Sequence, residues 1–144
     1  MSQVLLLGSF LTTSILIGAM LFFSFLVAPV VFIKLEAKTA GKFIRSIFPH
    51  YYIVIIILSL ISAFFSTFAN HNSAIIMWLV FLLGLYSRQI LMPKLNILRD
   101  SEIAGEKSAK RKFDLFHRLS VSINVTQLIL LIFSIYYVHS SILD

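Results

Sequence analysis

Four long apolar segments, separated by short polar ones, limit the folds that are open to this chain. They are residues 4–33, 50–69, 74–97 and 115–139. A transmembrane helix needs about 20 mostly apolar residues to cross a hydrocarbon core about 30 Å thick. Each of the four segments meets that length. The sequence therefore predicts an all-α fold, a bundle of four transmembrane helices that forms a single membrane domain over residues 1–144.

The composition supports a membrane protein. Apolar residues make up 59% of the chain and charged residues only 12%, with a mean hydropathy of +0.96. Soluble domains carry about a quarter charged residues. The sequence has no cysteine, which excludes disulfides and thiolate metal sites. The net charge of +6 is basic enough to suggest nucleic acid, but every lysine and arginine lies in residues 34–45 or 88–118. We therefore expect no nucleic-acid partner.

The position of the basic residues predicts the orientation. They lie in or beside two expected loops, residues 34–49 and 98–114, whereas the connection 70–73 holds no lysine or arginine. Loops rich in lysine and arginine stay on the cytoplasmic side of a membrane. We therefore expect both basic loops to be cytoplasmic and both termini to lie on the other side.

Several local features are expected along this path. Residues 41–48 carry apolar side chains at helical spacing, which predicts a short helix lying on the membrane surface, with Pro49 in the first turn of the next span. Within the spans, Pro29 predicts a kink because it leaves the carbonyl of Phe25 without a helical donor, and Pro93 predicts another.

The last apolar segment carries an unusual set of polar side chains. At 100° per residue, His117, Ser120, Asn124 and Gln127 share one narrow face of a helix. Polar side chains are costly in lipid, so this face is expected to meet protein or a wet cavity.

Other spans offer matching polar or small residues. Ser59 and Ser62 share a face of the second span, while Ser14 and Gly18 in the first are a small-xxx-small pair that allows close helix approach. We expect an intramembrane polar network of Ser59, Ser62, Ser120, Asn124 and Gln127, with interhelical hydrogen bonds that contribute about 0.6–2 kcal/mol each.

Arg88 is the most distinctive residue, because it lies inside the third span and no span contains an aspartate or glutamate. It is expected either to reach lipid phosphate or to bind an anionic or carbonyl ligand. Two helix N-termini and several cations are predicted at the same end of the bundle, which favours an anion. Ordinary anchoring at the membrane interface is the alternative. The candidate ligand-binding residues are Arg45, His50, Tyr51, Tyr52, Arg88 and His117.

The histidines support a second hypothesis. His50 and His117 begin the second and fourth spans, and paired imidazoles can hold a haem iron, so a haem or metal linked to His117 and His50 is an alternative. We otherwise expect no cofactor. The sequence contains no nucleophile–base pair, phosphate loop or metalloprotease motif, so an enzyme is not expected.

Four stretches carry a family resemblance. FFSFLVAPVVF, AGKFIRSIFPHYY, SRQILMPKLNILRD and FDLFHRLSVSINVTQL follow one another in the order found in the transmembrane-protein-205-like family, known in bacteria as a domain of unknown function. The chain resembles this family of small four-helix membrane proteins over nearly its whole length. His50 departs from the residues usual at its position. The chain is also distantly similar to copper-resistance and haem-pathway four-helix membrane proteins. Family motif positions are occupied by Pro29, Gly41, Pro49, Tyr51, Arg88, Pro93, His117, Ser120 and Asn124.

Together these features predict a protein of a bacterial inner membrane with no enzymatic role. We expect an accessory or structural subunit of a membrane assembly, or a protein that binds lipid or solute at its cytoplasmic mouth. The lipid bilayer is its expected partner, with other membrane subunits or further copies of the chain. The alternatives are the haem-linked or metal-linked protein and a small transporter of an anionic or amphipathic solute.

Overall fold

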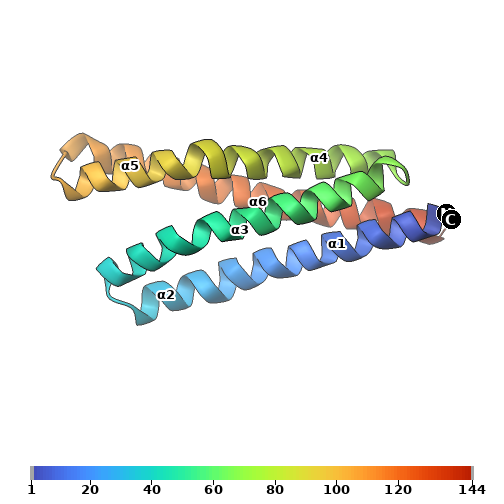
Figure 1. Cartoon of the computed structure of the whole chain (residues 1–144), viewed down its shortest axis with the longest axis horizontal. Coiled ribbons are helices and arrows are strands. Elements are labelled where there is room, and N and C mark those ends of the chain that lie inside the picture. Colours follow the sequence, from blue (N-terminus) through green and yellow to red (C-terminus); the bar gives the residue numbers. More distant parts are fainter. Residues whose placement is uncertain (1, 144) are drawn as a thin grey trace.

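The computed structural model describes residues 2–143, apart from the side chain of Ser2. Over these residues the chain is helical with no strand, as the all-α prediction requires. It forms four long helices (Figure 1), each long and apolar enough to cross a membrane. The first consists of α1 (Ser2–Phe22), η1 (Phe23–Val27) and α2 (Ala28–Lys34), the second is α3 (Ala37–Thr67), the third consists of α4 (His71–Tyr86), η2 (Ser87–Leu91) and α5 (Met92–Ile103), and the fourth is α6 (Lys107–Leu143).

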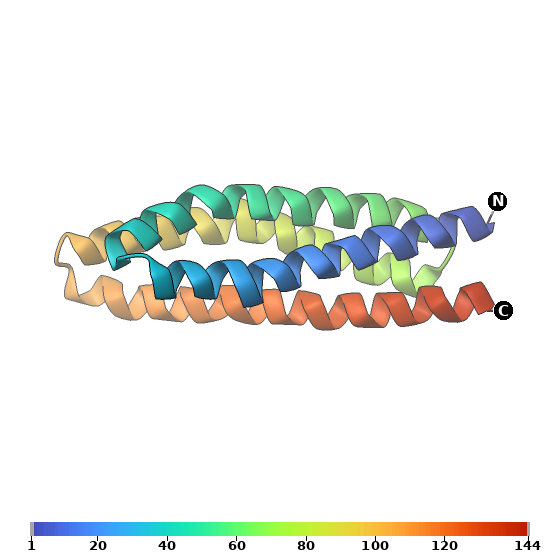
Figure 2. The ribbon, with the colours of Figure 1, turned by 90° about the horizontal axis from the view of Figure 1, so that it is seen from below.

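The long helices run up and down in sequence order. Both α1 and α4 pack against α3 and α6, so the first and fourth helices close the bundle (Figure 2). The start of α1, the end of α6 and the turn at residues 68–70 lie at one end of the bundle, which we call the terminal end (Figure 1). The turns at residues 35–36 and 104–106 lie at the opposite end. We call it the basic end, because the lysines and arginines belong to the helical segments nearest to it.

The helices extend beyond the predicted spans. Most of residues 34–49 and 98–114, the connections between the predicted spans, are helical. The predicted surface helix 41–48 is instead part of α3, and Pro49 lies inside that helix and not in a first turn. Proline removes one helical hydrogen bond, here to the carbonyl of Arg45. Arg45 is exposed near the start of α3, and the helix continues through Pro49 to Thr67.

Each proline inside the spans follows a turn of π-helix. The Ala28 N–H donates to the Phe23 carbonyl just before Pro29, and the Met92 N–H donates to the Ser87 carbonyl just before Pro93. A π turn inserts one extra residue and often marks a functional position in a helix. Pro29 and Pro93 indicated where the first and third long helices depart from a regular α-helix, and each departure is a π turn.

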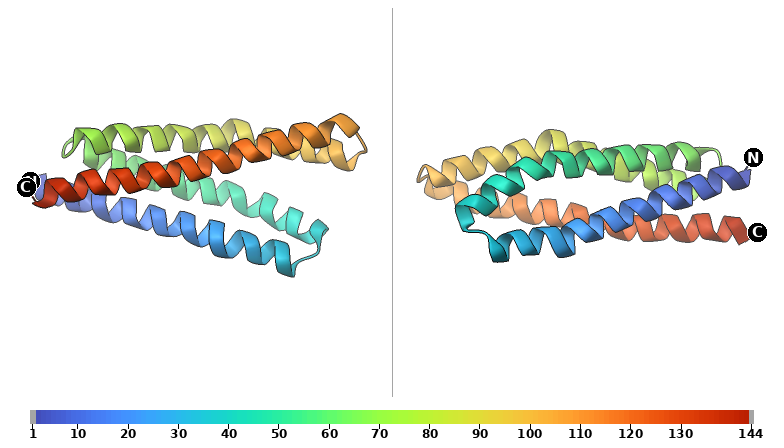
Figure 3. Two further views of the ribbon diagram at one scale, coloured as in Figure 1. Left: turned by 180° about the vertical axis from the view of Figure 1, so that it is seen from behind. Right: turned by 60° about the horizontal axis from the view of Figure 1, so that its bottom comes forward.

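The buried core lies toward the terminal end. Helix α5 has no buried residue, α2 has only Val31, α3 has only Ala40 before Tyr51, and α6 has only Ala109 before Gln127. At the basic end the α2–α3 hairpin therefore diverges from the α5–α6 hairpin (Figures 1 and 3). The centre of the core is fully buried and consists of Leu16, Met20, Ile55, Met77, Val80 and Leu131.

Candidate functional site

A chain of buried hydroxyl groups joins all four helices near the terminal end. Thr13 Oγ1 lies 2.7 Å from Ser62 Oγ, and Ser9 Oγ lies 3.2 Å from Ser62 Oγ and 2.7 Å from Ser66 Oγ. The chain continues from Ser66 to Ser73 at 3.0 Å and from Ser73 to Ser134 at 2.7 Å. All six side chains are fully buried. Each hydroxyl has a partner on another helix, so the chain holds the bundle together where lipid offers no hydrogen bonds.

Gln127 lies in the core, one layer further from the terminal end. Its side chain is fully buried and its Nε2 donates to the Val80 carbonyl at 3.1 Å, while its Oε1 has no partner among the described residues. It faces α4 beside Gly84, where a Cβ atom would lie 3.2 Å from Ile55 Cγ2. Gln127 is thus directed at protein and not at lipid.

Two adjacent tyrosines bind polar side chains in the next layer, on the basic-end side of Gln127. The Asn124 Nδ2 donates to the Tyr51 hydroxyl at 2.8 Å, and the Tyr52 hydroxyl lies 3.4 Å from Ser120 Oγ. Ser24 in η1 donates to Asn124 Oδ1 at 3.4 Å. Residues of η1, α3 and α6 therefore share one polar layer, which we call the tyrosine layer.

Aromatic rings support the tyrosine layer. Tyr51 stacks on Phe23 with ring centroids 4.2 Å apart, and Phe48 meets the Tyr51 ring edge to face at 6.0 Å. Stacked and edge-to-face pairs stabilise by about 0.5–1.5 kcal/mol beyond their burial. The rings hold both hydroxyl groups at a fixed depth in the bundle.

Arg88 lies in η2 beside this layer. It follows Gly84 by one helical turn, which places it near the side of the helix that packs on α3. Its side chain is partly buried, and its Nε is buried without a hydrogen-bond partner among the described residues. The neighbouring Ser87 Oγ is likewise buried without a partner. The salt bridges found among these residues do not include Arg88.

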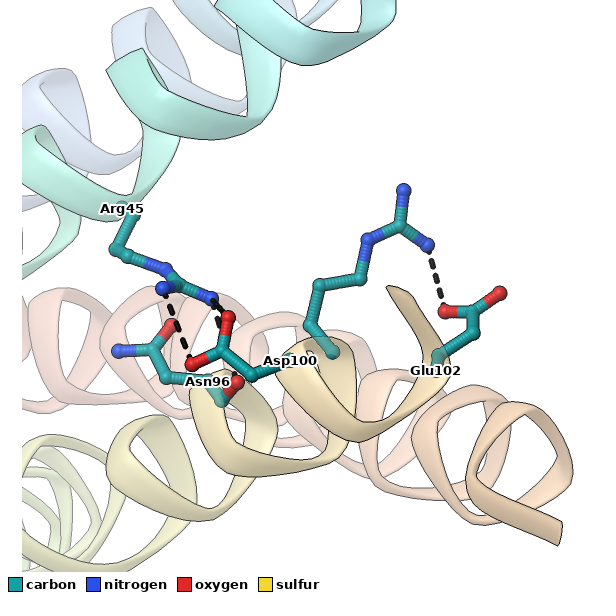
Figure 4. Close-up of polar contacts among 5 residues, drawn as sticks. Arg45, Asn96, Asp100 and Glu102 are labelled. Atoms are coloured by element: carbon teal, nitrogen blue, oxygen red, sulfur yellow. Dashed lines mark hydrogen bonds and ion pairs between the residues drawn. The ribbon is translucent and has the colours of Figure 1, made fainter. Parts of the chain in front are cut away.

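A charged contact spans the two hairpins at the basic end (Figure 4). Arg45 Nη2 lies 2.8 Å from Asp100 Oδ1, Nη1 lies 3.3 Å from Oδ2, and Nη2 also donates to the Asn96 carbonyl at 3.3 Å. Arg99 pairs with Glu102 at 2.7 Å within α5 (Figure 4). Arg45 therefore binds a carboxylate on the facing hairpin, whereas the sequence suggested a role as a ligand-binding cation.

The two candidate haem ligands lie on exposed helix faces. His50 Nδ1 is 3.1 Å from the Ser46 carbonyl of its own helix, and His117 stacks on Phe113, also of its own helix, with centroids 5.9 Å apart. Neither histidine contacts the tyrosine layer in these interactions. In residues 2–143 there is no group of three or more histidine, aspartate or glutamate side chains that could hold a metal ion.

The structure divides the predicted polar network into separate layers. Ser120 and Asn124 bind the tyrosines, Gln127 binds a backbone carbonyl, and Ser62 belongs to the hydroxyl chain. Ser59 is fully buried but bonds the Ile55 carbonyl of its own helix. His117 is exposed and stacks on Phe113 of its own helix, so it joins none of these layers.

One expected contact is wrong, and one set of residues was missed. A Cβ atom at Gly18 would meet nothing within 4 Å, and Ser14 bonds the Phe10 carbonyl of its own helix, so this pair does not bring two helices together. The close approach in α1 is instead at Gly8, where a Cβ atom would lie 3.0 Å from the Phe65 ring. Ser9 and Thr13 were missed, although their spacing of four residues matches that of Ser62 and Ser66.

Four helices long and apolar enough to cross a membrane, with polar side chains buried between them, are consistent with an integral membrane protein of the small helical-bundle class. A family model described as "Domain of unknown function (DUF4149)" matches residues 11–103, which is more than half of the chain. The chain belongs to this family. Searches of curated proteins and of solved structures found no match.

Proposed function

We propose that the protein binds a phosphate-bearing anionic amphiphile at its basic end, with Arg88 as the residue that contacts the phosphate. The observation that carries this proposal is the buried Arg88 Nε, which has no hydrogen-bond partner among the described residues. A charged side chain at membrane depth costs about 2.5–3.5 kcal/mol or more, so an arginine without a protein carboxylate needs another anion.

The acidic side chains of the chain leave Arg88 available to bind an external anion. Every aspartate and glutamate lies outside the predicted spans. Asp100 is paired with Arg45, and Glu102 with Arg99. A guanidinium offers five donors in a planar fork, which suits the oxygens of a phosphate group.

The surroundings suit an amphiphile in particular. Beyond the tyrosine layer, α2 buries only Val31, so acyl chains can lie along its exposed apolar side chains, which include Val30, Phe32 and Ile33. Under the positive-inside rule the basic end faces the cytoplasm, and the phosphate would then come from the inner leaflet or from a soluble phosphate compound.

A second candidate is an accessory subunit of a membrane assembly or a homo-oligomer. Its support is the same sparse packing of α2, whose exposed apolar side chains suit the helices of a partner as well as lipid. Stoichiometric co-purification of a membrane partner that protects α5 from labelling would favour it. No contact in the described residues favours the haem or transporter alternatives: His50 and His117 lie on exposed faces of α3 and α6, and the central core cluster consists of buried apolar side chains.

Native mass spectrometry with two variants tests the lipid proposal. Arg88→Leu removes the cation beside the tyrosine layer, and Arg118→Leu removes an exposed one on α6 as a matched control. A lost charge-assisted hydrogen bond costs about 1.5–3 kcal/mol. Arg88→Leu should therefore weaken retention of phosphatidylglycerol at least about tenfold, while Arg118→Leu changes it little. Parallel titrations with phosphatidylcholine and with inorganic phosphate distinguish a lipid headgroup from free phosphate. Equal retention by the wild type and both variants would contradict the proposal.

A further inference from the structure

We propose that the basic end opens further and recloses: the α2–α3 and α5–α6 hairpins separate about the two π turns, and the Arg45–Asp100 ion pair limits their separation at the outer edge. The opening itself is independent of the ligand, but the statement that it admits a phosphate-bearing amphiphile to Arg88 rests on the proposed function.

The two π turns are placed where hinges are needed. Ser24 in η1 donates to Asn124, which binds Tyr51, so η1 adjoins the tyrosine layer. At η2, Ser87 is buried where η2 contacts α3, one turn beyond Gly84, whose Cβ would lie beside Ile55. Both hinges therefore lie at one depth, on the first and third helices, and each is followed by a proline that leaves a carbonyl without its helical donor. Helices bend at prolines and π turns more easily than elsewhere.

Packing changes abruptly at this depth. On the terminal side of the tyrosine layer, fully buried side chains from all four helices fill the bundle. On the basic side, α5 buries no residue and α2 buries only Val31. Segments with few buried contacts open at a lower free-energy cost than the rest of a structure. The basic half can thus separate while the terminal half stays packed.

The Arg45–Asp100 pair is the polar contact that joins the hairpins at the outer edge. It makes two nitrogen–oxygen contacts at 2.8 and 3.3 Å, and its side chains are 41% and 60% exposed. Arg45 also donates to the Asn96 carbonyl of α5. Exposed ion pairs stabilise weakly. Such a latch shifts the balance of open and closed forms a few-fold and does not lock either one.

A single thiol measures the opening. The chain has no cysteine, so Ser87→Cys introduces one thiol at a position only 1% exposed in the closed form. Its reaction rate with a charged, water-soluble methanethiosulfonate reports the fraction of open molecules. Asp100→Asn should raise that rate about two- to fivefold, as expected for loss of an exposed ion pair. The double exchange Arg45→Asp with Asp100→Arg should restore the wild-type rate.

A double proline variant tests the hinges, and a second thiol position tests whether the opening is confined to the basic end. Pro29→Ala with Pro93→Ala restores the helical donors and should slow the reaction. Ser134→Cys places the thiol in the fully buried hydroxyl chain at the terminal end, and its rate should not respond to Asp100→Asn. An Asp100→Asn effect that is absent at Ser87→Cys, or equal at both thiols, overturns the proposal. If Ser87→Cys does not fold, spin labels at Lys38→Cys and Lys110→Cys serve instead, and Asp100→Asn must add longer distances.

The two proposals can fail separately. If Asp100→Asn speeds labelling but Arg88→Leu leaves lipid retention unchanged, the proposed opening stands and the proposed binding of phosphate by Arg88 is refuted. If Arg88→Leu weakens lipid retention but Asp100→Asn does not change the labelling rate, the proposed phosphate binding stands and the proposed role of the Arg45–Asp100 pair is refuted.

Discussion

Replacing Ser9 by alanine should measure how much the hydroxyl chain stabilises the bundle. Ser9 Oγ lies at the middle of the chain, 2.7 Å from Ser66 Oγ and 3.2 Å from Ser62 Oγ, and its side chain is fully buried. Ser9→Ala therefore removes two interhelical hydrogen bonds and leaves a void of only one oxygen atom. Interhelical hydrogen bonds in membranes average about 0.6 kcal/mol and reach about 1.7 kcal/mol, so the two together predict a loss of about 1–2 kcal/mol.

The neighbouring hydroxyls limit this cost. Ser66 keeps its contact with Ser73 at 3.0 Å and Ser62 keeps its contact with Thr13 at 2.7 Å, so neither is left without a partner. Ser134 has one partner in the chain, at 2.7 Å, and Ser134→Ala should cost about 0.6 kcal/mol.

Ser14 provides the matched control on the same helix. Its hydroxyl bonds only the Phe10 carbonyl of α1, so Ser14→Ala removes no interhelical contact and should change stability by less than about 0.5 kcal/mol. Reversible unfolding by sodium dodecyl sulfate in mixed micelles, followed by circular dichroism, compares the three variants. A Ser14→Ala loss as large as that of Ser9→Ala would refute the reasoning that interhelical hydroxyl contacts stabilise the bundle.

Three other predictions concern packing, capping and sidedness. Gly84→Ala should destabilise by about 1–3 kcal/mol in the same unfolding assay, because its Cβ would lie 3.2 Å from Ile55 Cγ2, whereas Gly18→Ala, with nothing within 4 Å, should be neutral or stabilising. Asn70→Ala removes the acceptor 2.8 Å from the Ser73 N–H at the start of α4 and the Nδ2 donor 2.8 Å from Ser141 Oγ of α6, so it should cost at least the about 0.5–2 kcal/mol of a lost cap, seen as a lower midpoint. Lys110→Cys in right-side-out vesicles should resist an impermeant maleimide until the membrane is broken; immediate labelling would place the basic end outside the cell.

The number and character of the helices followed from simple lengths. Residues 4–33, 50–69, 74–97 and 115–139 are each apolar for long enough to cross a bilayer, and the structure contains a long apolar helix over each. The helix ends were less predictable. Residues 37–49 lie outside the predicted span 50–69 and yet belong to α3, since a helix continues through water as readily as through the membrane interface.

The polar residues illustrate what spacing can and cannot predict. Ser120, Asn124 and Gln127 face protein because they lie on the buried side of α6. His117 shares their stripe on a helical wheel, yet it is exposed, because a wheel does not tell where neighbouring helices diverge. Ser9 and Thr13 were overlooked since serine and threonine are common in membrane helices and often bond their own backbone, as Ser14 does.

The most direct test of phosphate binding by Arg88 is a nitrogen–phosphorus distance measured in a bilayer. Protein carrying ¹⁵N-labelled arginine side chains, placed in phosphatidylglycerol membranes, should show dephasing of a guanidinium signal by lipid ³¹P in solid-state NMR. That signal should disappear in Arg88→Leu and persist in Arg118→Leu. Identical dephasing in the wild type and in Arg88→Leu would mean that the phosphate is bound elsewhere, and Arg88 would not be the ligand-binding residue.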